Sequence, residues 1–305
     1  MTTYDATSLN DFRRCPALWQ QRHGLGLVKV YDIPDAADAG AAWHVGMRAW
    51  FGAPTSELAL PLAQAALLKA WGEEPLLESA LPNKRPRGLY EAMLRTYAEK
   101  WPRERDGFEV VRNEEWCEAT IVPHPGSAPA QVGELSFPQA PTFSYGGIVD
   151  RLIRLDGANY VMDTKTTALY LNDAFFASYE LSTQLRGYVA LELVLGRECE
   201  GAYIDAVHVD TRSQKPKPEH FVRWGPIRYD QQRLSAWARD AERTIGEIER
   251  YLREEGLDSR WEQRDLSCRA WGKLCSYWDR CSVAPELVHL VPGYKEEPWR
   301  PNERT

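Results

Sequence analysis

The hydrophobic residues of this chain recur at helical spacing in some stretches and alternate at strand spacing in others. Apolar residues three and four positions apart predict helices, and alternation predicts half-buried strands. The predicted helices are residues 9–23, 36–51, 56–71, 88–101, 181–195 and 230–255. The predicted strands are residues 108–121, 143–155, 159–166, 201–209 and 221–224. Ser8 precedes the first helix and is predicted to cap it.

The order of these elements predicts a mixed α/β fold. Between His44 and Asp210 the chain runs helix, three strands, helix, strand, which indicates an α/β core with a mixed sheet. We expect a single domain, residues 1–305, with three successive parts. These are a mainly helical part at 1–106, a sheet core at 107–226, and a long helix with a cysteine-rich tail at 227–305.

Two acids and a lysine fall on consecutive predicted strands. Asp150 lies on the first strand, and Asp163 and Lys165 share one face of the second because strand side chains alternate. Asp156-Gly157 between them is a strong hairpin signal, which places Asp150 beside the other two. Paired carboxylates suit Mg²⁺ or Mn²⁺, and a nearby lysine can orient water or neutralise phosphate charge. These residues suit hydrolysis of a phosphodiester.

Composition and net charge limit where the protein can act and what it can bind. The chain has 44% hydrophobic and 27% charged residues and no apolar run of membrane-spanning length, so we expect no membrane association and a cytoplasmic location. The net charge of −7 argues against a surface that coats nucleic acid non-specifically. Local basic segments at 84–87 and 212–217 could still contact a DNA backbone, or could be solvated loops.

Three motifs together resemble a known superfamily. They are Gly147-Ile-Val-Asp150-Arg151, then Val161-Met-Asp163-Thr-Lys165, then Gln184-Leu-Arg-Gly-Tyr188. In this order they resemble the PD-(D/E)XK nucleases, in particular the RecB-like iron–sulfur exonucleases, which include the AddB nuclease domain and CRISPR-associated RecB-type exonucleases. The resemblance covers most of the chain and implies a restriction-endonuclease-like core with extra N-terminal helices.

The resemblance assigns roles to individual residues. It implies that Mg²⁺ or Mn²⁺ is bound by His44, Asp150, Asp163 and the backbone carbonyl of Thr164. It implies catalytic roles for Lys165, Asp150, Asp163, Gln184 and Tyr188. Each motif is weak alone: Asp150-Arg151 could be an ion pair at a strand edge, His44 a packed residue, and Gln184 and Tyr188 ordinary helix positions.

A further acid lies on the strand before the hairpin. Related nucleases often carry a glutamate near the site, and Glu114-Glu115 occupies that strand. We take Glu115 as the candidate, although the sequence does not fix which of the two points inward.

The cysteines fall into two groups. Cys15 near one end and Cys268, Cys275 and Cys281 near the other match the arrangement of iron–sulfur members of the RecB-like branch. The resemblance therefore implies a [4Fe-4S] cluster on these four thiolates, joining the chain ends in a C-terminal clasp. Relatives often place the first two of the C-terminal three closer together than here. Zinc and buried free thiols are the alternatives, and Cys117 and Cys199 are predicted to lie in the core.

The predicted function is a metal-dependent DNA nuclease, with exonuclease action on single strands or DNA ends. The alternatives are a site-specific endonuclease, a non-catalytic nucleic-acid-binding protein, or a structural subunit of a repair or recombination complex. The chain contains no Gly-x-x-x-x-Gly-Lys-Ser/Thr phosphate loop. We therefore expect any helicase, or any recombination or CRISPR partner, to be a separate chain.

Overall fold

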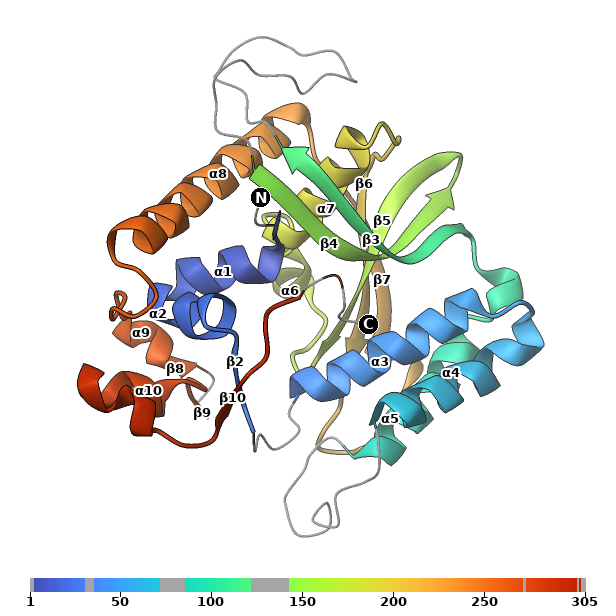
Figure 1. Cartoon of the computed structure of the whole chain (residues 1–305). Helices are drawn as coiled ribbons and strands as arrows, with labels where there is room; N and C mark the ends of the chain where they lie inside the picture. Colours follow the sequence, from blue (N-terminus) through green and yellow to red (C-terminus); the bar gives the residue numbers. More distant parts are fainter. Residues whose placement is uncertain are drawn as a thin grey trace. The chain divides into compact units, whose positions relative to one another are not determined.

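The chain, whose helices and strands are labelled in Figure 1, forms two compact units that interleave along the sequence. The computed structural model describes residues 3–30, 36–71, 86–121, 143–270, 273–300 and 302. The first unit combines residues 1–33, 118–147 and 230–304, and the second combines residues 34–117 and 148–229. Strands β3 (Glu109–Ile121) and β4 (Phe143–Leu155) run from one unit into the other along the chain.

The second unit contains a mixed sheet. After β4 come β5 (Ala158–Thr167), β6 (Gly201–His208) and β7 (Phe221–Arg228), and the strands lie in the order β4-β5-β6-β7. Strands β5 and β6 are parallel, whereas the β4–β5 and β6–β7 pairs are antiparallel. β3 pairs with β4. This confirms the predicted α/β fold with a mixed sheet.

The β4–β5 connection is the hairpin that the sequence predicts. β4 ends at Leu155 and β5 begins at Ala158, so only Asp156 and Gly157 lie in the turn. Their φ angles are 50° and 82°. A two-residue hairpin turn with both φ angles positive favours Asp-Gly, which tolerates this backbone and matches the twist of the flanking strands.

Three helices of the second unit share a core. They are α3 (Ala36–Gly52), α4 (Ser56–Trp71) and α5 (Arg87–Lys100). Trp43, Met47 and Tyr97 are almost wholly buried there, and Val207 and Phe221 of the sheet region belong to the same cluster. Helices α6 (Asp173–Ala177) and α7 (Thr183–Val194) follow β5, and the side chain of Ser182 accepts a hydrogen bond from Leu185 N to cap α7.

The first unit brings the two ends of the described chain together. Its elements are β1 (Thr3–Tyr4), α1 (Ala6–Arg14), α2 (Pro16–Trp19), β2 (Leu27–Lys29), α8 (Gln231–Glu254), α9 (Asp265–Cys268), β8 (Arg269–Ala270), β9 (Lys273–Leu274), α10 (Trp278–Ser282) and β10 (Tyr294–Glu296). β2 pairs antiparallel with β10. Arg13 Nε of α1 donates to Thr244 Oγ1 of α8 at 3.0 Å, and Trp19 stacks on Trp261 with ring centroids 5.4 Å apart.

The structure corrects the predicted first helix. It begins at Ala6, and Asp5 caps it by accepting a hydrogen bond from Ser8 N at 2.6 Å, so Ser8 is not the cap. The helix also stops at Cys15, which is extended with φ of −166°, before the short helix α2 begins at Pro16. Proline lacks the N–H and disfavours a helical residue before it, which explains the break. Lys84 and Arg85 of the basic segment at 84–87 lie outside the described residues.

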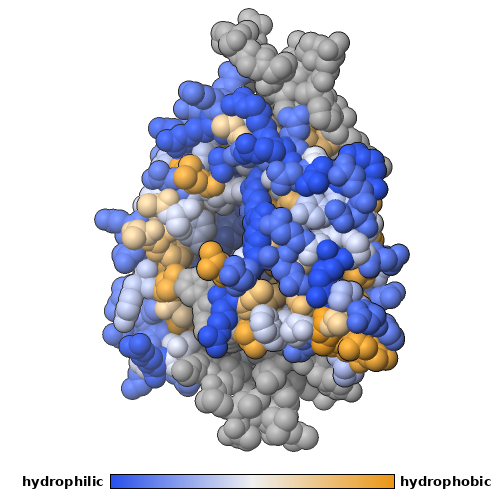
Figure 2. Space-filling view, turned by 90° about the vertical axis from the view of Figure 1, so that its left-hand side faces the viewer, coloured by the Kyte–Doolittle hydropathy of each residue, from blue (hydrophilic) through white to orange (hydrophobic). Residues whose placement is uncertain are grey.

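The surface drawn in Figure 2 is mainly hydrophilic, with hydrophobic residues in small separate patches. Among the described residues, no helix combines the length and apolarity needed to cross a membrane.

Candidate active site

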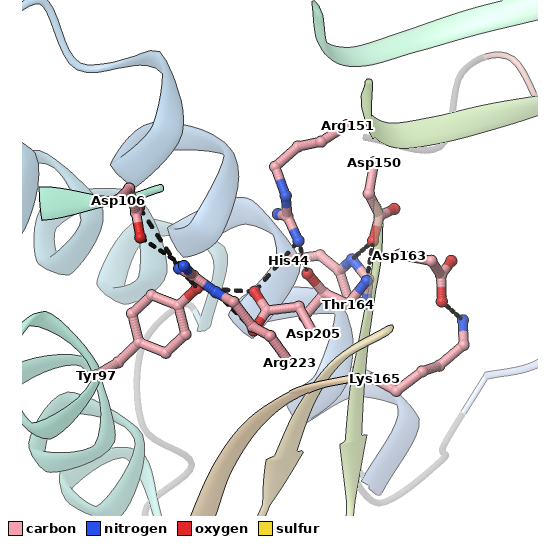
Figure 3. Close-up of polar contacts among 10 residues, drawn as sticks. All are labelled: His44, Tyr97, Asp106, Asp150, Arg151, Asp163, Thr164, Lys165, Asp205 and Arg223. Atoms are coloured by element: carbon pink, nitrogen blue, oxygen red, sulfur yellow. Dashed lines mark hydrogen bonds and ion pairs between the residues drawn. The ribbon is translucent and has the colours of Figure 1, made fainter. Parts of the chain in front are cut away.

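The two predicted acids face one another across the β4–β5 hairpin. Arg151 pairs with Met162, and continuing this antiparallel register by one residue places Asp150 opposite Asp163. Directly opposed residues point to the same face of a sheet. Both side chains are buried, and Asp150 is held by a hydrogen bond from Thr164 N to its Oδ2 at 2.7 Å (Figure 3).

Lys165 links the acids to helix α7. Its Nζ lies 2.6 Å from Asp163 Oδ2 and donates to Gln184 Oε1 at 2.8 Å. Gln184 Nε2 in turn donates to Tyr188 Oη at 3.0 Å. Gln184 and Tyr188 are one helical turn apart and so lie on the same side of α7. The structure thus joins the second and third sequence motifs in one hydrogen-bonded chain.

His44 of α3 completes the cluster of predicted metal ligands. Its Nδ1 lies 3.2 Å from Asp150 Oδ2, and Figure 3 draws both residues together. Burial lowers the pKa of His44, but the charge of Asp150 and the contact with it raise that pKa by more, so the histidine favours its protonated form. The reverse holds for Asp150: burial alone would raise its pKa, but His44, Arg151 and Lys165 hold it well below the ordinary value.

Asp163 has a different electrostatic environment. Burial raises its pKa, and Lys165 offsets this only in part. Burial also disfavours the charged form of Lys165, yet the two nearby aspartates raise the pKa of this lysine above its ordinary value. Apart from the ion pair with Lys165, neither carboxylate oxygen of Asp163 has a hydrogen-bond partner in the described part of the chain. A buried carboxylate with so few partners lowers the stability of the fold unless a further cation binds it.

These residues fit a divalent metal ion by their chemistry. Two carboxylates and an imidazole are ligands for Mg²⁺ or Mn²⁺, and Asp163 Oδ1, which has no partner in the described chain, is available to such an ion. Within the described residues, no set of three or more His, Cys, Asp or Glu side chains is already arranged to hold a metal. His44 Nδ1 and Asp150 Oδ2 contact each other instead.

The structure distinguishes Glu114 from Glu115. Glu115 forms ion pairs with Arg112 and Arg197, and its side chain is 41% exposed. Glu114 is largely buried and lies 3.4 Å from Arg48; burial raises its pKa, and the charge of Asp150 raises it further. The candidate additional acid is therefore Glu114 rather than Glu115. Its φ of 44° interrupts the alternation of β3, which is why strand parity could not identify it.

Tyr179 also lies near the acids and was not predicted. Burial raises the pKa of its hydroxyl, while the charges of Lys165 and Asp163 act on it in opposite directions. It follows helix α6 in a segment without a motif, so no sequence signal pointed to it.

The opposite face of the same strands carries a second polar network. Strand alternation turns Arg151 and Thr164 away from the acids, and Arg151 donates to Thr164 Oγ1 at 2.5 Å and to Asp205 at 3.3 Å. Tyr97 Oη donates to Asp205 at 2.8 Å, and Arg223 pairs with Asp106 (Figure 3). This buried network holds both strands from behind the acids.

In the first unit the four predicted cluster cysteines gather around one small cavity. Cys15, Cys268, Cys275 and Cys281 line it together with Tyr277 and Trp278. Burial, followed by the proximity of the other three cysteines, raises the pKa of Cys281 to about 11. Cys117 and Cys199 are buried, as predicted. The four cysteines that line the cavity are close together, but no described group of three or more His, Cys, Asp or Glu side chains is arranged as a metal site, so an iron–sulfur clasp is not shown.

The site has the composition of a metal-dependent nuclease: two opposed acids and an adjacent lysine on a mixed sheet. The model of the PD-(D/E)XK nuclease superfamily matches residues 5–282, and the chain belongs to this superfamily. Comparison with curated proteins gave no match. A solved structure described as "Crystal structure of SSO0001" is 15% identical, with 68% of this chain and 74% of that chain covered and a TM-score of 0.29. That likeness is too low to support an argument.

Proposed function

We propose that this protein is a metal-dependent DNA exonuclease with a structural [4Fe-4S] cluster. The observation that carries the nuclease assignment is the buried Asp163, opposed to Asp150 and paired with Lys165, whose carboxylate has no hydrogen-bond donor other than Lys165 in the described chain. The exonuclease assignment rests on the resemblance of the motifs to the RecB-like branch.

The residues have separate tasks in this proposal. Asp150, Asp163, His44 and the Thr164 carbonyl would hold Mg²⁺ or Mn²⁺, which when bound polarises the phosphate and lowers the pKa of water. Lys165 provides a positive charge beside the attacked phosphate. Gln184 fixes the direction of the lysine, and Tyr188 fixes Gln184.

Digestion of end-labelled DNA tests the proposal. Single-stranded and duplex substrates labelled at either end are incubated with the protein, with and without Mn²⁺. We expect mononucleotides or short products that depend on metal, and none from Asp163→Ala. Asp173→Ala is the matched control, because Asp173 is an exposed acid in the first turn of α6. It should cut at the wild-type rate.

Circular single-stranded DNA separates the alternatives. Its cleavage would indicate an endonuclease, and failure to cut any substrate by iron-loaded protein in Mn²⁺ would indicate a binding or structural protein. Both results would contradict the exonuclease proposal.

The cluster is the second part of the proposal. Its support is the shared cavity of Cys15, Cys268, Cys275 and Cys281, whose positions in the chain match the iron–sulfur branch. Thiolate ligands suit such a cluster. The spacing Cys268–Cys275 does not fit the tight Cys-x₂₋₄-Cys hairpin of most structural zinc sites. Its task would be to fasten α2 to the segment that contains α9 and α10.

A further inference from the structure

We propose that Tyr170 and His208 form a stacking site for an unpaired base of single-stranded DNA, next to the nuclease site. This inference rests on the proposed nuclease function and names its substrate class. Tyr170 and His208 are stacked, with ring centroids 5.4 Å apart and ring planes 19° from parallel. His220 packs edge-on against His208 at 5.0 Å and 80°.

The stack is both exposed and fixed. Tyr170 is 74% exposed, so burial of its own ring in the protein does not account for an aromatic residue at this position. His208 Nδ1 donates to the backbone carbonyl of Leu169 at 2.9 Å, which holds the imidazole in place beneath the tyrosine. A flat, pre-ordered aromatic surface that faces solvent can accept a base at low entropic cost.

The sheet register places the stack beside the acids. His208 of β6 pairs with Thr167 of β5, and Thr167 is two residues beyond Lys165. Two strand residues span about 6.6 Å, and positions two apart point to the same face. Register partners on neighbouring strands also share a face. His208 therefore lies on the same face as Asp163 and Lys165, within reach of a nucleotide adjacent to the one being cut.

Positive charge adjoins the stack. Arg212, Lys215 and Lys217 are exposed on the loop that follows β6. Asp210 orders this loop by accepting hydrogen bonds from the backbone N–H groups of Arg212 and Ser213 at 3.0 and 3.1 Å. The loop leads directly to His220, which touches the stack. Cationic side chains next to aromatic rings match the phosphates and bases of a nucleic-acid strand.

The occupant is single-stranded rather than duplex DNA because the rings can stack only on a base whose flat face is exposed. In a duplex the bases are paired and stacked on each other, and their flat faces are inaccessible. An unpaired strand exposes those faces, and stacking on aromatic side chains contributes affinity without reading sequence.

Binding of DNA to a catalytically inactive variant tests this inference. Fluorescence anisotropy would measure the affinity of Asp163→Asn protein for labelled single-stranded and duplex DNA in Mg²⁺. Adding Tyr170→Ala should weaken single-strand binding about 5- to 100-fold, the effect of losing one stacked base, and leave duplex binding within about twofold. Tyr170→Phe keeps the ring and should bind like the parent. Leu195→Ala, an exposed apolar residue at the end of α7, is the matched control.

A single abasic nucleotide gives a second measurement. Moved along the strand, it should weaken binding at one position near the cut, and Tyr170→Ala should abolish that position dependence. Equal single-strand affinity of the Tyr170→Ala and Tyr170→Phe proteins would overturn the inference, as would an equal loss of duplex binding. Binding is measured without cleavage. If the wild-type protein cuts DNA but Tyr170→Ala does not change DNA affinity, only the stacking site is refuted. A Tyr170-dependent affinity in a protein that never cuts DNA refutes only the catalytic proposal.

Discussion

Gln184 Oε1 accepts a hydrogen bond from Lys165 Nζ at 2.8 Å, and the same Nζ lies 2.6 Å from Asp163 Oδ2. The lysine is thus held between an acid on its own strand and an amide on helix α7. Two fixed partners restrict a side chain that otherwise has many rotamers. The relation makes Gln184 a positioning residue for the lysine.

Gln184→Ala should therefore slow DNA cleavage without weakening DNA binding. We expect kcat to fall about 10- to 100-fold, the range typical of a lost catalytic positioning contact, with KM nearly unchanged. Tyr188→Phe removes only the hydroxyl that supports Gln184 and should cause a smaller loss. Steady-state kinetics on labelled DNA would measure both variants. A Gln184→Ala protein that changes KM alone would show that Gln184 binds DNA rather than orienting Lys165.

The raised pKa of His44 predicts opposite effects of pH on the metal-free and metal-bound protein. In the metal-free protein, the pairing of protonated His44 with Asp150 stabilises the fold fully below the ordinary histidine pKa. This contribution is lost as pH rises through the raised folded pKa. A metal ligand must be a neutral imidazole, so stabilisation by Mg²⁺ should grow over the same interval.

Thermal unfolding from about pH 6 to about pH 9, with and without Mg²⁺, would measure this effect. The lowered pKa of Asp150 acts only in acid, below the ordinary carboxyl range, and stays outside that window. The increase in Tm caused by Mg²⁺ should rise with pH in the wild-type protein and vary little in His44→Asn. A wild-type increase that does not change with pH would argue against His44 as a ligand.

Arg151→Met should destabilise the second unit strongly. The arginine is 2% exposed, and its loss removes one of the cations that compensate the fully buried Asp205. We expect a loss of about 3 kcal/mol, near the lower end for breaking a buried pair, because Arg223 stays near Asp205.

Urea unfolding would measure that loss against a control on the same strand. Arg154 pairs with Glu109 in an exposed position, so Arg154→Met should change stability by less than about 1 kcal/mol. Similar losses of unfolding free energy in the two variants would show that the buried network stabilises the fold no more than an exposed ion pair does.

Cys275→Ala should prevent the proposed cluster from forming. The wild-type protein purified without oxygen should be coloured and carry about four iron atoms per chain, and the variant should be colourless, poor in iron and less stable. Cys199→Ala changes a buried cysteine outside the cavity and should keep its iron. Iron and zinc analysis with visible absorption would decide the matter. Zinc in place of iron, or a stable Cys275→Ala protein with full iron content, would contradict the proposed cluster.

Much of the second unit could be predicted because its signals are local. The turn at Asp156-Gly157 needs two positive φ angles that few residue pairs accept, and alternation alone puts Asp163 and Lys165 on one face. Together these determine the hairpin on which the candidate site is built.

Features that depend on distant partners could not be predicted. Arg151 looks like an edge residue in the sequence, yet it is buried because Thr164 and Asp205 lie beneath it. The Tyr170–His208 stack likewise depends on the register between strands β5 and β6, which helices α6 and α7 separate in the sequence. The choice between Glu114 and Glu115 could not be made for a backbone reason, since the positive φ of Glu114 breaks the period on which strand reasoning depends.

The interleaving of the two units sets an order in which they become complete during synthesis. All of the second unit's main segments precede residue 230, whereas the first needs both its opening 33 residues and everything from 230 onward. At about 5–20 residues per second, Cys15 leaves the ribosome on the order of ten seconds or more before Cys281 exists. The second unit can therefore fold before Cys281 is synthesised, and any cluster that binds Cys15 together with the three C-terminal cysteines can only be inserted afterwards.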